Sequence, residues 1–483
     1  MRAIVAGAGP AGCACAKWLN DRGFDVVLLE KRAVPGGKVS AWRDADGDWV
    51  ESGLHVFFGA YHNLLNFLTE CGLADSFDWK PAEMVFASPA RGLAPIRFVP
   101  GLPAPLNGLA GVAVSPLMSA GDKLRMALGL LRPIFGSQAY IDAQDDQSYA
   151  AWHLRHGMGQ RTLDDVMHTM ALALNFQHAD KVSAKLVLTA LLHFAQETNA
   201  PKMGLVKGSP HERLWVPLIQ LLAGRGVKIV LGRKVDHICY DADANRVTGF
   251  ALDDGSTLEG DIYISAMPVH SLRKALAPAL KQQPRFAGLR HLKGQPVITA
   301  QLYFDRMVTE VDNLLFSAGS HLSVVADLPR ISPDYHTGRG SIVELVVAPA
   351  EDLIGQSDEV ILKLVLSDFY RLHPAARDAK LIKYTLVRIP NSVYQARPGV
   401  DQYRPDQSTP VPNLFLAGDY TQQEFMASIE GAVRSAKRVV ERIDRARDGG
   451  WELGVRSRHI SEPPSPNLHP HGVTNAAFRH DYP

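Results

Sequence analysis

The stretch RAIVAGAGPAGCACAKWLNDRGFDVVLLEKR, residues 2–32, decides the fold of the first part of the chain. Its apolar run at residues 3–6 predicts a short buried strand that leads into a turn rich in glycine. A helix to about residue 21 and a second strand at residues 24–29 follow. This order of strand, turn, helix and strand predicts a βαβ unit and therefore an α/β fold with a Rossmann-like sheet.

Each glycine of the turn has a physical reason. Gly7 permits the tight turn, Gly9 lets a pyrophosphate approach the helix N-terminus, and Gly12 lets helix and strand pack closely. Glu30 follows Gly12 by eighteen residues, where its carboxylate can accept hydrogen bonds from a ribose; an acid there argues against a 2′-phosphate. The pattern predicts dinucleotide binding, and the alternative is a purely structural βαβ unit. The expected contacts are Gly7, Gly9, Pro10, Ala11, Gly12, Glu30 and Lys31.

Two further segments identify the nucleotide. KRAVPGGKVSAW, residues 31–42, holds a second glycine turn, and in NLFLAGDYTQQEFMASIEGAV a strand at residues 414–417 leads through a Gly-Asp pair to a helix. Both resemble flavoproteins of the amine oxidase and carotenoid desaturase superfamily, in which they lie against the cofactor's diphosphate and ribityl chain. The resemblance implies FAD. The residues assigned to it here are Gly36, Gly37, Lys38, Val235, Gly418, Asp419, Met426 and Ile429.

The stretch ESGLHVFFGAYHN, residues 51–63, combines two glycines with aromatic side chains. We expect Gly53 and Gly59 to let the backbone run close to the cofactor. Consecutive residues of a strand point in opposite directions, so at least one of the two phenylalanines is expected in the core. Gly53, Leu54 and His55 are assigned to the cofactor, with His55 as a structural residue rather than a base, and Phe57, Phe58 and Tyr61 to the substrate or acceptor pocket.

The sequence predicts two interleaved parts. We expect a discontinuous FAD-binding domain, a mixed α+β substrate domain that also contacts the membrane, and a disordered tail without periodicity. The strands of the FAD domain include those expected within residues 226–238 and 261–267. The predicted divisions are 1–75, 205–275 and 405–445 for the FAD domain, 76–204 and 276–404 for the substrate domain, and 446–483 for the tail.

Composition restricts the function classes. The 483 residues carry 51 basic and 50 acidic side chains, a formal net charge of +1, so nucleic acid is not an expected partner. The four cysteines lack zinc-like spacing; we expect reduced thiols, a cytosolic compartment and no metal. The chain opens directly on a strand, so no leader is expected in it, and no apolar run reaches the ~18 residues of a spanning helix.

A series of segments outside the FAD motifs carries a more specific resemblance. Together with GLHVFFGAY and LAGDYTQQEFMASIEGAV, the series is similar to the 15-cis-phytoene desaturases of the plant and cyanobacterial type, from the first residue to about residue 443. Its members are LPAPLNG (102–108), GSQAYIDAQD (136–145), MALALNF (170–176), HFAQETNAPKMGLVKGSPHERL (193–214), YFDR (303–306), DNLLFS (312–317), ELVVAPAED (344–352) and PNSVYQARPG (390–399).

This resemblance implies an FAD-dependent oxidoreductase acting on CH–CH bonds. It implies a C40 polyene substrate, noncovalent FAD and a membrane quinone as electron acceptor, with desaturation of 15-cis-phytoene through phytofluene to poly-cis ζ-carotene. Hydride loss from an allylic carbon is feasible because the remaining cation is delocalised, and a neighbouring carbon then loses a proton. The protein mainly has to hold the chain against the flavin and exclude water.

Few side chains are candidates for catalysis. The family suggests no obligatory side-chain base, and the flavin-proximal candidates are Tyr420, Thr421 and Glu430, the last of which could equally cap or pair within its helix. Phe176 and His193 are assigned to the substrate or acceptor pocket. The chain departs from the family at His193, where arginine is usual, and at Ile429, where methionine is usual. Acceptor choice is therefore open.

Residues 98–140 are expected to contact a membrane. The portion KLRMALGLLRPIF sets basic residues beside leucines, which predicts an interfacial helix, or alternatively an ordinary core-facing amphipathic helix. With the resemblance, we expect a peripheral protein on the cytoplasmic side of the membrane, and a homo-oligomer stays open.

Three other functions stay open from the sequence. The first is another flavin-dependent polyene enzyme, either a ζ-carotene desaturase or a hydroxysqualene-type dehydroxylase. The second is an amine oxidase on the same fold, although the last cysteine, Cys239, lies far from the C-terminal flavin segment where covalent oxidases need one. The third is a flavin-holding scaffold without turnover.

Overall fold

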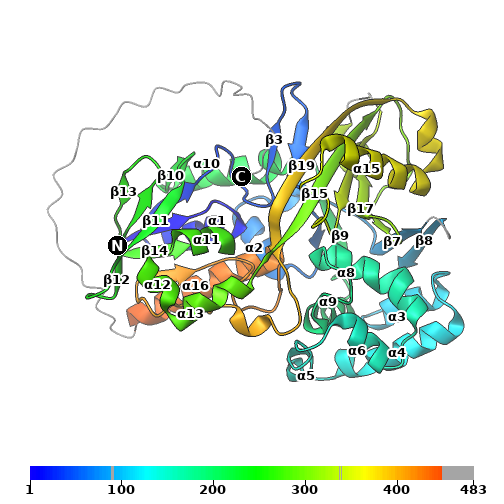
Figure 1. Ribbon diagram of the computed structural model, residues 1–483, viewed down its shortest axis with the longest axis horizontal. Helices are drawn as coiled ribbons and strands as arrows, with labels where there is room; N and C mark the ends of the chain where they lie inside the picture. The colour runs from blue at the N-terminus through cyan, green and yellow to red at the C-terminus, as the bar shows by residue number, and fades with distance from the viewer. Residues whose placement is uncertain (89–91, 337, 339, 449–483) are drawn as a thin grey trace.

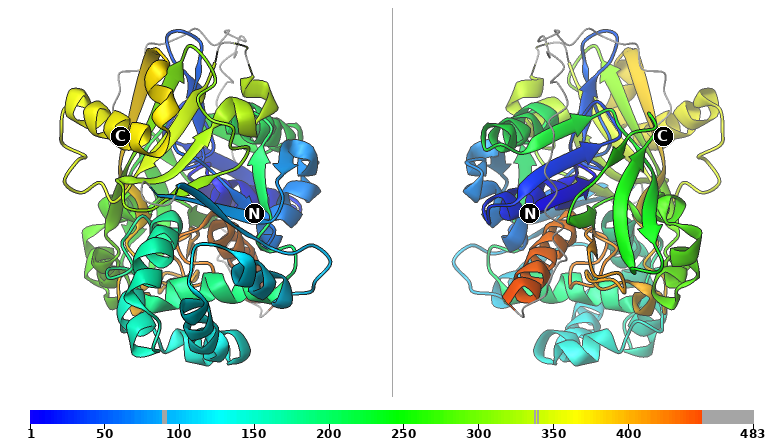
Figure 2. Two further views of the ribbon diagram at one scale, coloured as in Figure 1. Left: turned by 90° about the vertical axis from the view of Figure 1, so that its right-hand side faces the viewer. Right: turned by 90° about the vertical axis from the view of Figure 1, so that its left-hand side faces the viewer.

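The computed structural model describes residues 1–88, 92–336, 338 and 340–448. Figure 1 shows a parallel sheet and its helices on one side of the molecule, and a larger mixed sheet on the other side. A lobe of helices lies beneath the larger sheet. In both views of Figure 2 this lobe, coloured cyan and teal, forms the lower end of the molecule.

The glycine-rich N-terminal motif belongs to a five-stranded parallel sheet with the order β10-β2-β1-β14-β20. Its central strands are buried on both faces, as expected for a parallel sheet covered by helices. Helix α1 (Pro10–Asn20) packs on helix α16 (Ile429–Asp448) in a core shared with this sheet. The strands are β1 (Arg2–Ala6), β2 (Asp25–Glu30), β10 (Lys228–Leu231), β14 (Ile262–Ser265) and β20 (Leu414–Leu416).

The strands predicted at residues 3–6, 24–29 and 414–417 are confirmed to within one residue at each end. The expectation for residues 226–238 was only partly right. Strand β10 joins the parallel sheet, but Gly232 has a positive φ of 70° and the chain turns there. The next strand, β11 (Val235–Asp241), instead pairs antiparallel with β12 (Arg246–Leu252), which also pairs with β13 (Thr257–Leu258).

A seven-stranded mixed sheet forms the second layer, in the order β19-β15-β18-β17-β16-β7-β8. Its long strands β15 and β19 pair antiparallel along most of their length, and helix α15 (Asp358–Leu372) covers one face. The strands are β7 (Glu83–Ser88), β8 (Gly92–Arg97), β15 (Gly294–Phe304), β16 (Leu315–Ser317), β17 (Leu322–Asp327), β18 (Ile342–Val347) and β19 (Leu381–Tyr394).

The helical lobe has well-defined helix starts. Ser119 and Ser148 each accept a hydrogen bond from the backbone N–H three residues later, which caps α4 and α6. Among the described residues, no helix is both long enough and apolar enough to span a bilayer. The helices of the lobe are α3 (Leu106–Val114), α4 (Ala120–Phe135), α5 (Gln138–Asp142), α6 (Tyr149–Arg155), α7 (Gln160–Thr162), α8 (His168–Asn175) and α9 (Ala184–Gln196).

Shorter elements connect the two layers. They include a small sheet with the order β5-β9-β6, the hairpin of β3 and β4, and helix α2, which follows β5. These elements are β3 (Ala41–Arg43), β4 (Trp49–Glu51), β5 (Phe57–Phe58), β6 (Phe77–Trp79), β9 (Met203–Val206), α2 (His62–Glu70), α10 (Val216–Gly224) and α11 (Val269–Ala275).

The exact boundaries of the two predicted domains remain a prediction. Each of the segments 1–75, 205–275 and 405–445 supplies strands to the parallel sheet, while 76–204 and 276–404 both supply strands to the seven-stranded sheet. Helix α16 runs to Asp448, beyond the expected end at residue 445. The expected disordered tail was 446–483; residues 446–448 belong to α16, and residues 449–483 lie outside the described residues.

Candidate active site

The site begins where two glycine turns meet backbone to backbone. Gly7 has a φ of 109°, and a Cβ added there would stand 2.7 Å from the carbonyl oxygen of Ala266. A Cβ on Gly37, with a φ of 59°, would stand 2.9 Å from the Cα of Gly9, which is the N-cap of α1. Because neither turn tolerates a side chain, the helix N-terminus stays open to a ligand.

Two of the glycines assigned to the cofactor have a packing reason instead. A Cβ on Gly12 would overlap the carbonyl oxygen of Gly7, and one on Gly36 would stand 2.5 Å from the indole ring of Trp215. Neither Gly12 nor Gly36 lines the cavity described below. They hold the two turns in place, and their assignment as direct cofactor contacts is corrected accordingly.

Glu30 closes the other side of the turn at the end of β2. Its carboxylate accepts hydrogen bonds from the backbone N–H groups of Ala8, at 2.9 Å, and Arg32, at 3.1 Å. The side chain is buried and lines the cavity together with Lys31. The carboxylate is therefore held in a fixed orientation at the point where the motif predicts a ribose.

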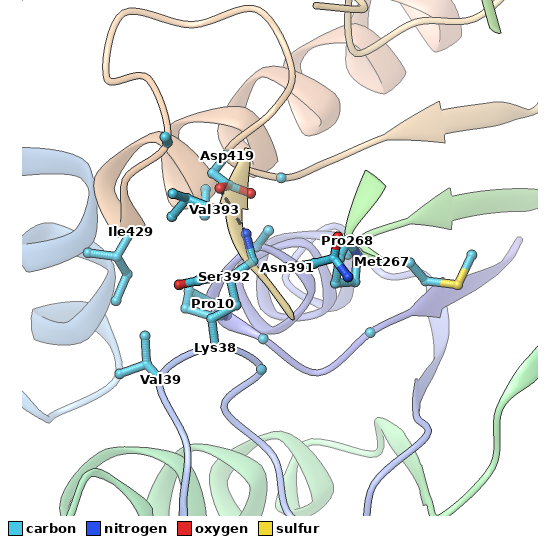
Figure 3. A pocket seen from close by; sticks show the side chains of 18 of the residues that line it. Pro10, Lys38, Val39, Met267, Pro268, Asn391, Ser392, Val393, Asp419 and Ile429 are labelled. Atoms are coloured by element: carbon cyan, nitrogen blue, oxygen red, sulfur yellow. Dashed lines mark hydrogen bonds and ion pairs between the residues drawn. The ribbon is translucent and has the colours of Figure 1, made fainter. Parts of the chain in front are cut away.

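The C-terminal Gly-Asp element meets the second glycine turn across the site. Figure 3 shows Asp419 near Lys38, whose ammonium lies 3.0 Å from the Asp419 carboxylate. Gly418 has a φ of 144° and donates its N–H to the Ser435 hydroxyl of α16 at 2.7 Å. The ion pair thus connects segments that lie 381 residues apart in the sequence.

Basic side chains lie at the end of the cavity where the glycine turns meet. Burial, and then the nearby Arg32, lowers the pKa of Lys31. Burial also lowers the pKa of His270 to about 4, with further contributions from Lys38, Lys31 and Lys274. A phosphate group would relieve this repulsion between like charges, so the charge pattern fits an anionic nucleotide.

These turns open into a cavity of about 1260 Å³ that continues between the two layers. The volume exceeds the ~300–1,000 Å³ usual for a pocket that holds one small ligand. The cofactor and pocket residues predicted from the sequence that line it are Gly7, Gly9, Pro10, Ala11, Glu30, Lys31, Gly37, Lys38, Gly53, Leu54, His55, Phe58, Tyr61, Phe176, His193, Val235, Gly418, Asp419, Met426 and Ile429.

The two phenylalanines of the aromatic stretch separate as expected. The ring of Phe58 lines the cavity and lies 5.2 Å from that of Phe194 and 5.5 Å from that of Tyr61, between ring centroids. Phe57 is buried on the other side, 4.7 Å from the ring of Phe77, and does not line the cavity. Its assignment to the substrate is therefore corrected to core packing.

The two histidines of the cavity have different surroundings. His55 Nε2 lies 2.9 Å from the Lys38 carbonyl oxygen, which can only accept, so this nitrogen carries the proton. The His193 ring stacks on Phe425 with 4.4 Å between centroids and an interplanar angle of 13°. Burial lowers the pKa of His193, although Glu197 and Glu424 oppose the effect. At neutral pH His193 is therefore an uncharged, flat wall residue.

None of the three candidate catalytic residues lines the cavity. The Glu430 carboxylate accepts hydrogen bonds from the N–H groups of Asn63 and Leu64, at 3.0 and 2.8 Å, and so caps the first turn of α2. The Thr421 hydroxyl donates to the Gly418 carbonyl at 3.0 Å, and Tyr420 is buried. These contacts give Glu430 and Thr421 structural roles, at the cap of α2 and in the turn after Gly418, and we withdraw the proposal that the three residues are catalytic.

Several residues of the cavity wall were not predicted from the sequence. Strand β15 contributes Val297 and Thr299, β18 contributes Val346, and the end of β19 contributes Asn391 and Val393. Figure 3 shows Asn391, Ser392 and Val393 beside Asp419 and Pro268. The segment PNSVYQARPG supported the family resemblance, and that resemblance was the only sequence signal that its first residues lie at the site.

One acidic group in the described part of the chain has the geometry of a metal site, namely Asp44, Asp46 and Asp48 in the hairpin of β3 and β4. The ammonium of Lys383 contacts all three carboxylates, at 2.5, 2.7 and 2.8 Å. The lysine thus supplies the positive charge that the cluster needs.

Comparison with known proteins agrees with this geometry. A family model described as flavin containing amine oxidoreductase matches residues 10–444. The 15-cis-phytoene desaturase of Synechococcus elongatus is 41% identical over 467 residues, covering 95% of this chain and 98% of the relative. The chloroplastic/chromoplastic 15-cis-phytoene desaturase of Solanum lycopersicum is 39% identical, covering 96% of this chain and 80% of the relative.

Two more distant similarities complete the comparison. A probable ζ-carotene desaturase from Synechococcus elongatus is 35% identical over 471 residues, covering 91% of this chain and 98% of the relative. A crystal structure of an oxidoreductase from Methanosarcina mazei superimposes with a TM-score of 0.70 at 18% identity, covering 91% of this chain and all of that one. The structural likeness shows the shared fold alone.

Proposed function

Because the chain belongs to the flavin containing amine oxidoreductase family, and within it to the 15-cis-phytoene desaturases of the plant and cyanobacterial type, we propose that it desaturates 15-cis-phytoene through phytofluene to ζ-carotene. The observation that carries the proposal is the cavity, in which a cradle for a dinucleotide continues into an apolar wall. A hydrocarbon offers no group to hydrogen-bond, so shape and apolar contact must bind it.

The residues of the cradle fit FAD. The side-chain-free turns at Gly9 and Gly37 leave room for a diphosphate, and the Glu30 carboxylate is held where the motif predicts a ribose. Lys31 and Lys38 of the lining supply positive charge for an anion. A bound flavin would supply the two-electron acceptor for a hydride. The described lining contains no cysteine, so we propose that the FAD is held noncovalently.

The chain's own residues hold the polyene and exclude water. Phe58, Tyr61 and Phe194 form an aromatic wall on one side, and Val297 and Val346 of the seven-stranded sheet form an aliphatic wall. A conjugated chain pressed between flat walls is kept near the geometry in which an allylic C–H bond faces the acceptor. The described lining holds few ionisable groups at its apolar end. The proposal therefore rests on alignment of the substrate rather than on acid–base catalysis by a side chain.

We propose that the protein lies on a membrane through helices α3 and α4. Val114 and Phe135 are 78% and 70% exposed, and Leu124, Leu128 and Leu131 of α4 are also exposed. Helix α4 packs on α9, whose residues Thr189, Ala190 and His193 line the cavity. The proposed route takes a lipid-soluble substrate from the bilayer past α4 and α9 to the cavity. The same route would admit a membrane quinone as electron acceptor.

Pigment analysis in a phytoene-accumulating bacterial host tests the proposal. Expression of the chain should convert phytoene to phytofluene and ζ-carotene, resolved by chromatography and absorption spectra. A matched Asp419→Asn variant, which loses the ion pair with Lys38, should accumulate less product in proportion to its flavin content. Unchanged phytoene in the presence of flavin-loaded, membrane-bound protein would refute the proposal.

A second candidate is favoured by the 35% identity to a probable ζ-carotene desaturase. The same host supplied with ζ-carotene instead of phytoene distinguishes the two activities. Consumption of ζ-carotene without consumption of phytoene would favour the second candidate. An amine oxidase would instead release hydrogen peroxide with amines in the absence of any polyene.

A further inference from the structure

Phe176 has an unusual backbone conformation for a bulky residue. It follows the last residue of α8 with φ 57° and ψ 23°, in the left-handed region. Glycine or asparagine normally occupies this position after a helix, because a Cβ is strained there. The only other non-glycine residues with positive φ in the described part of the chain are Asn245 and Ala427. Of the three, asparagine tolerates this region best, whereas a bulky residue such as phenylalanine is an outlier there.

A buried amide holds the chain in this conformation. The Asn175 side chain is fully buried, donates its Nδ2–H to the Tyr394 carbonyl at 3.3 Å, and accepts the N–H of Ala396 at 3.1 Å. The Phe176 N–H in turn donates to the Leu172 carbonyl at 2.9 Å. Both ends of the Asn175 amide are therefore used to tie α8 to the chain that leaves β19, and the strained turn lies next to this tie.

The strained backbone directs the Phe176 ring into the cavity wall. Phe176 packs against the buried cluster of Val297, Val346 and Ala348, against which Leu54 also packs. Phe176, Leu54, Val297 and Val346 all line the cavity. Leu54 lies between Gly53 and His55, which also line it. Phe176 thus lies where the helical lobe, the sheet and the segment after β4 meet.

We propose that Phe176 is a specificity-determining residue of the desaturase, held by the Asn175 amide so that its ring fixes how the polyene chain is seated and hence how many desaturations follow. The inference rests on the proposed function and deepens it. Strained backbone persists in a protein only where the surrounding structure imposes it, and such positions concentrate at ligand sites. Since a hydrocarbon presents no polar handle, a rigid ring is the kind of group that can set its position.

Three variants test this role. Phe176→Leu reduces the size of the side chain in the wall, and Phe176→Gly removes that side chain and also relieves the backbone strain. Asn175→Ala removes the hydrogen bonds that tie α8 to the chain leaving β19. The ratio of phytofluene to ζ-carotene should change at least about tenfold in each, which is the discrimination expected when an apolar pocket gains or loses bulk. Phytoene binding to protein with its flavin already reduced, where no turnover occurs, should weaken in the same order as the ratio changes.

The control is Phe369→Leu, the same substitution at a buried ring of α15 that does not line the cavity. It should lower the melting temperature without changing the product ratio. If Asn175→Ala fails to fold, Phe176→Gly still decides, because glycine suits the backbone. An unchanged ratio in Phe176→Gly, with the parent active on phytoene, would overturn the inference, whereas an inactive parent would refute the proposed function itself.

Discussion

At the scale of single residues, similar sequence signals have different physical causes. Gly53 and Gly59 flank the same aromatic stretch, and both were expected to let the backbone approach the cofactor. Gly53 lines the cavity, and a Cβ there would meet only ordinary contacts, 3.7 Å from Thr299 Oγ1 and His55 Cε1. Gly59 does not line the cavity, and a Cβ there would overlap the Asn199 carbonyl. The expectation for Gly59 was therefore wrong, because protein backbone fills that space.

The two glycines predict opposite outcomes for the same substitution. Gly59→Ala should destabilise the protein by at least about 2 kcal/mol, since the backbone of Asn199 cannot yield easily. Gly53→Ala should leave the melting temperature of the flavin-free protein nearly unchanged but reduce the flavin retained on purification. Thermal unfolding and the ratio of flavin to protein absorbance measure both. A large loss of stability in Gly53→Ala would contradict this account.

Asp327 gives a prediction for the pH dependence of stability. Burial raises the pKa of its carboxyl to about 6 from 3.8, although a hydrogen bond from Ser341 opposes the shift. As pH rises from about 4 through about 6, the unfolded chain releases this proton and the folded chain keeps it, so the free energy of unfolding should fall by roughly 3 kcal/mol. Denaturant unfolding across this range measures the decline.

Asp327→Asn is the matched variant for that measurement, because it has nearly the same shape and cannot ionise. Its free energy of unfolding should decline less between pH 4 and pH 7 than that of the parent. Parallel declines in the two proteins would show that other groups, such as the buried Glu344, whose pKa burial also raises, dominate the pH dependence.

At the scale of elements, helix α4 shows why amphipathic patterns are ambiguous. Within residues 98–140, which were expected to contact a membrane, the portion KLRMALGLLRPIF was expected to be an interfacial helix, with a core-facing helix as the alternative. The structure places this portion within α4, and α4 has both properties: Leu130 and Gly129 are buried in the lobe, whereas Leu124, Leu128 and Leu131 are exposed. A single apolar stripe cannot distinguish these faces, because both follow the period of 3.6 residues.

The exposed face of α4 predicts membrane affinity. The triple variant Leu124→Gln, Leu128→Gln and Leu131→Gln should bind lipid vesicles about 100-fold more weakly, since each leucine contributes about 1 kcal/mol when its exposed part enters lipid. Co-sedimentation with vesicles measures the partition. The control replaces Val360 and Ile382, exposed residues of α15 and β19, by glutamine and should leave binding unchanged. Equal binding of the two variants would count against this surface.

At the scale of the whole molecule, the cavity exists only because distant segments come together. The residues that line it come from the parallel sheet, from the ends of β15, β18 and β19, and from helices α8 and α9. The ion pair of Lys38 with Asp419 and the hydrogen bonds of Glu430 to α2 connect the first 75 residues with the C-terminal helix. The cavity wall therefore combines all of these parts.

Flavin should therefore stabilise the whole fold. Binding at 1,000 times the dissociation constant adds about 4 kcal/mol to the free energy of unfolding, so flavin-free protein should melt higher after FAD is added. Lys38→Met should reduce this rise, while its flavin-free form melts close to the flavin-free parent because the Lys38 side chain is partly exposed. Differential scanning calorimetry with and without FAD tests both statements. A rise as large in the variant as in the parent would remove Lys38 from the cofactor site.

The sequence by itself determined the local elements and the family. The glycine turn after β1, Glu30 at the end of β2 and the Gly-Asp pair after β20 each depend on neighbours within a few residues, so their patterns could be identified in the sequence. The resemblance of the remaining segments identified the relatives. Local geometry depends on neighbouring residues, and shared ancestry preserves similar segments of sequence. These predictions therefore agreed with the structure and the comparisons.

Only the tertiary structure decided which side chains share the site. It assigned Phe57 to the core and Phe58 to the cavity, Gly59 to packing, and Glu430 to the cap of α2. It also brought Val297, Thr299 and Val346 into the wall and put strain on Phe176. These outcomes depend on contacts between residues far apart in the chain. The packing that decides them exists only in three dimensions, so no local pattern of the sequence contains it.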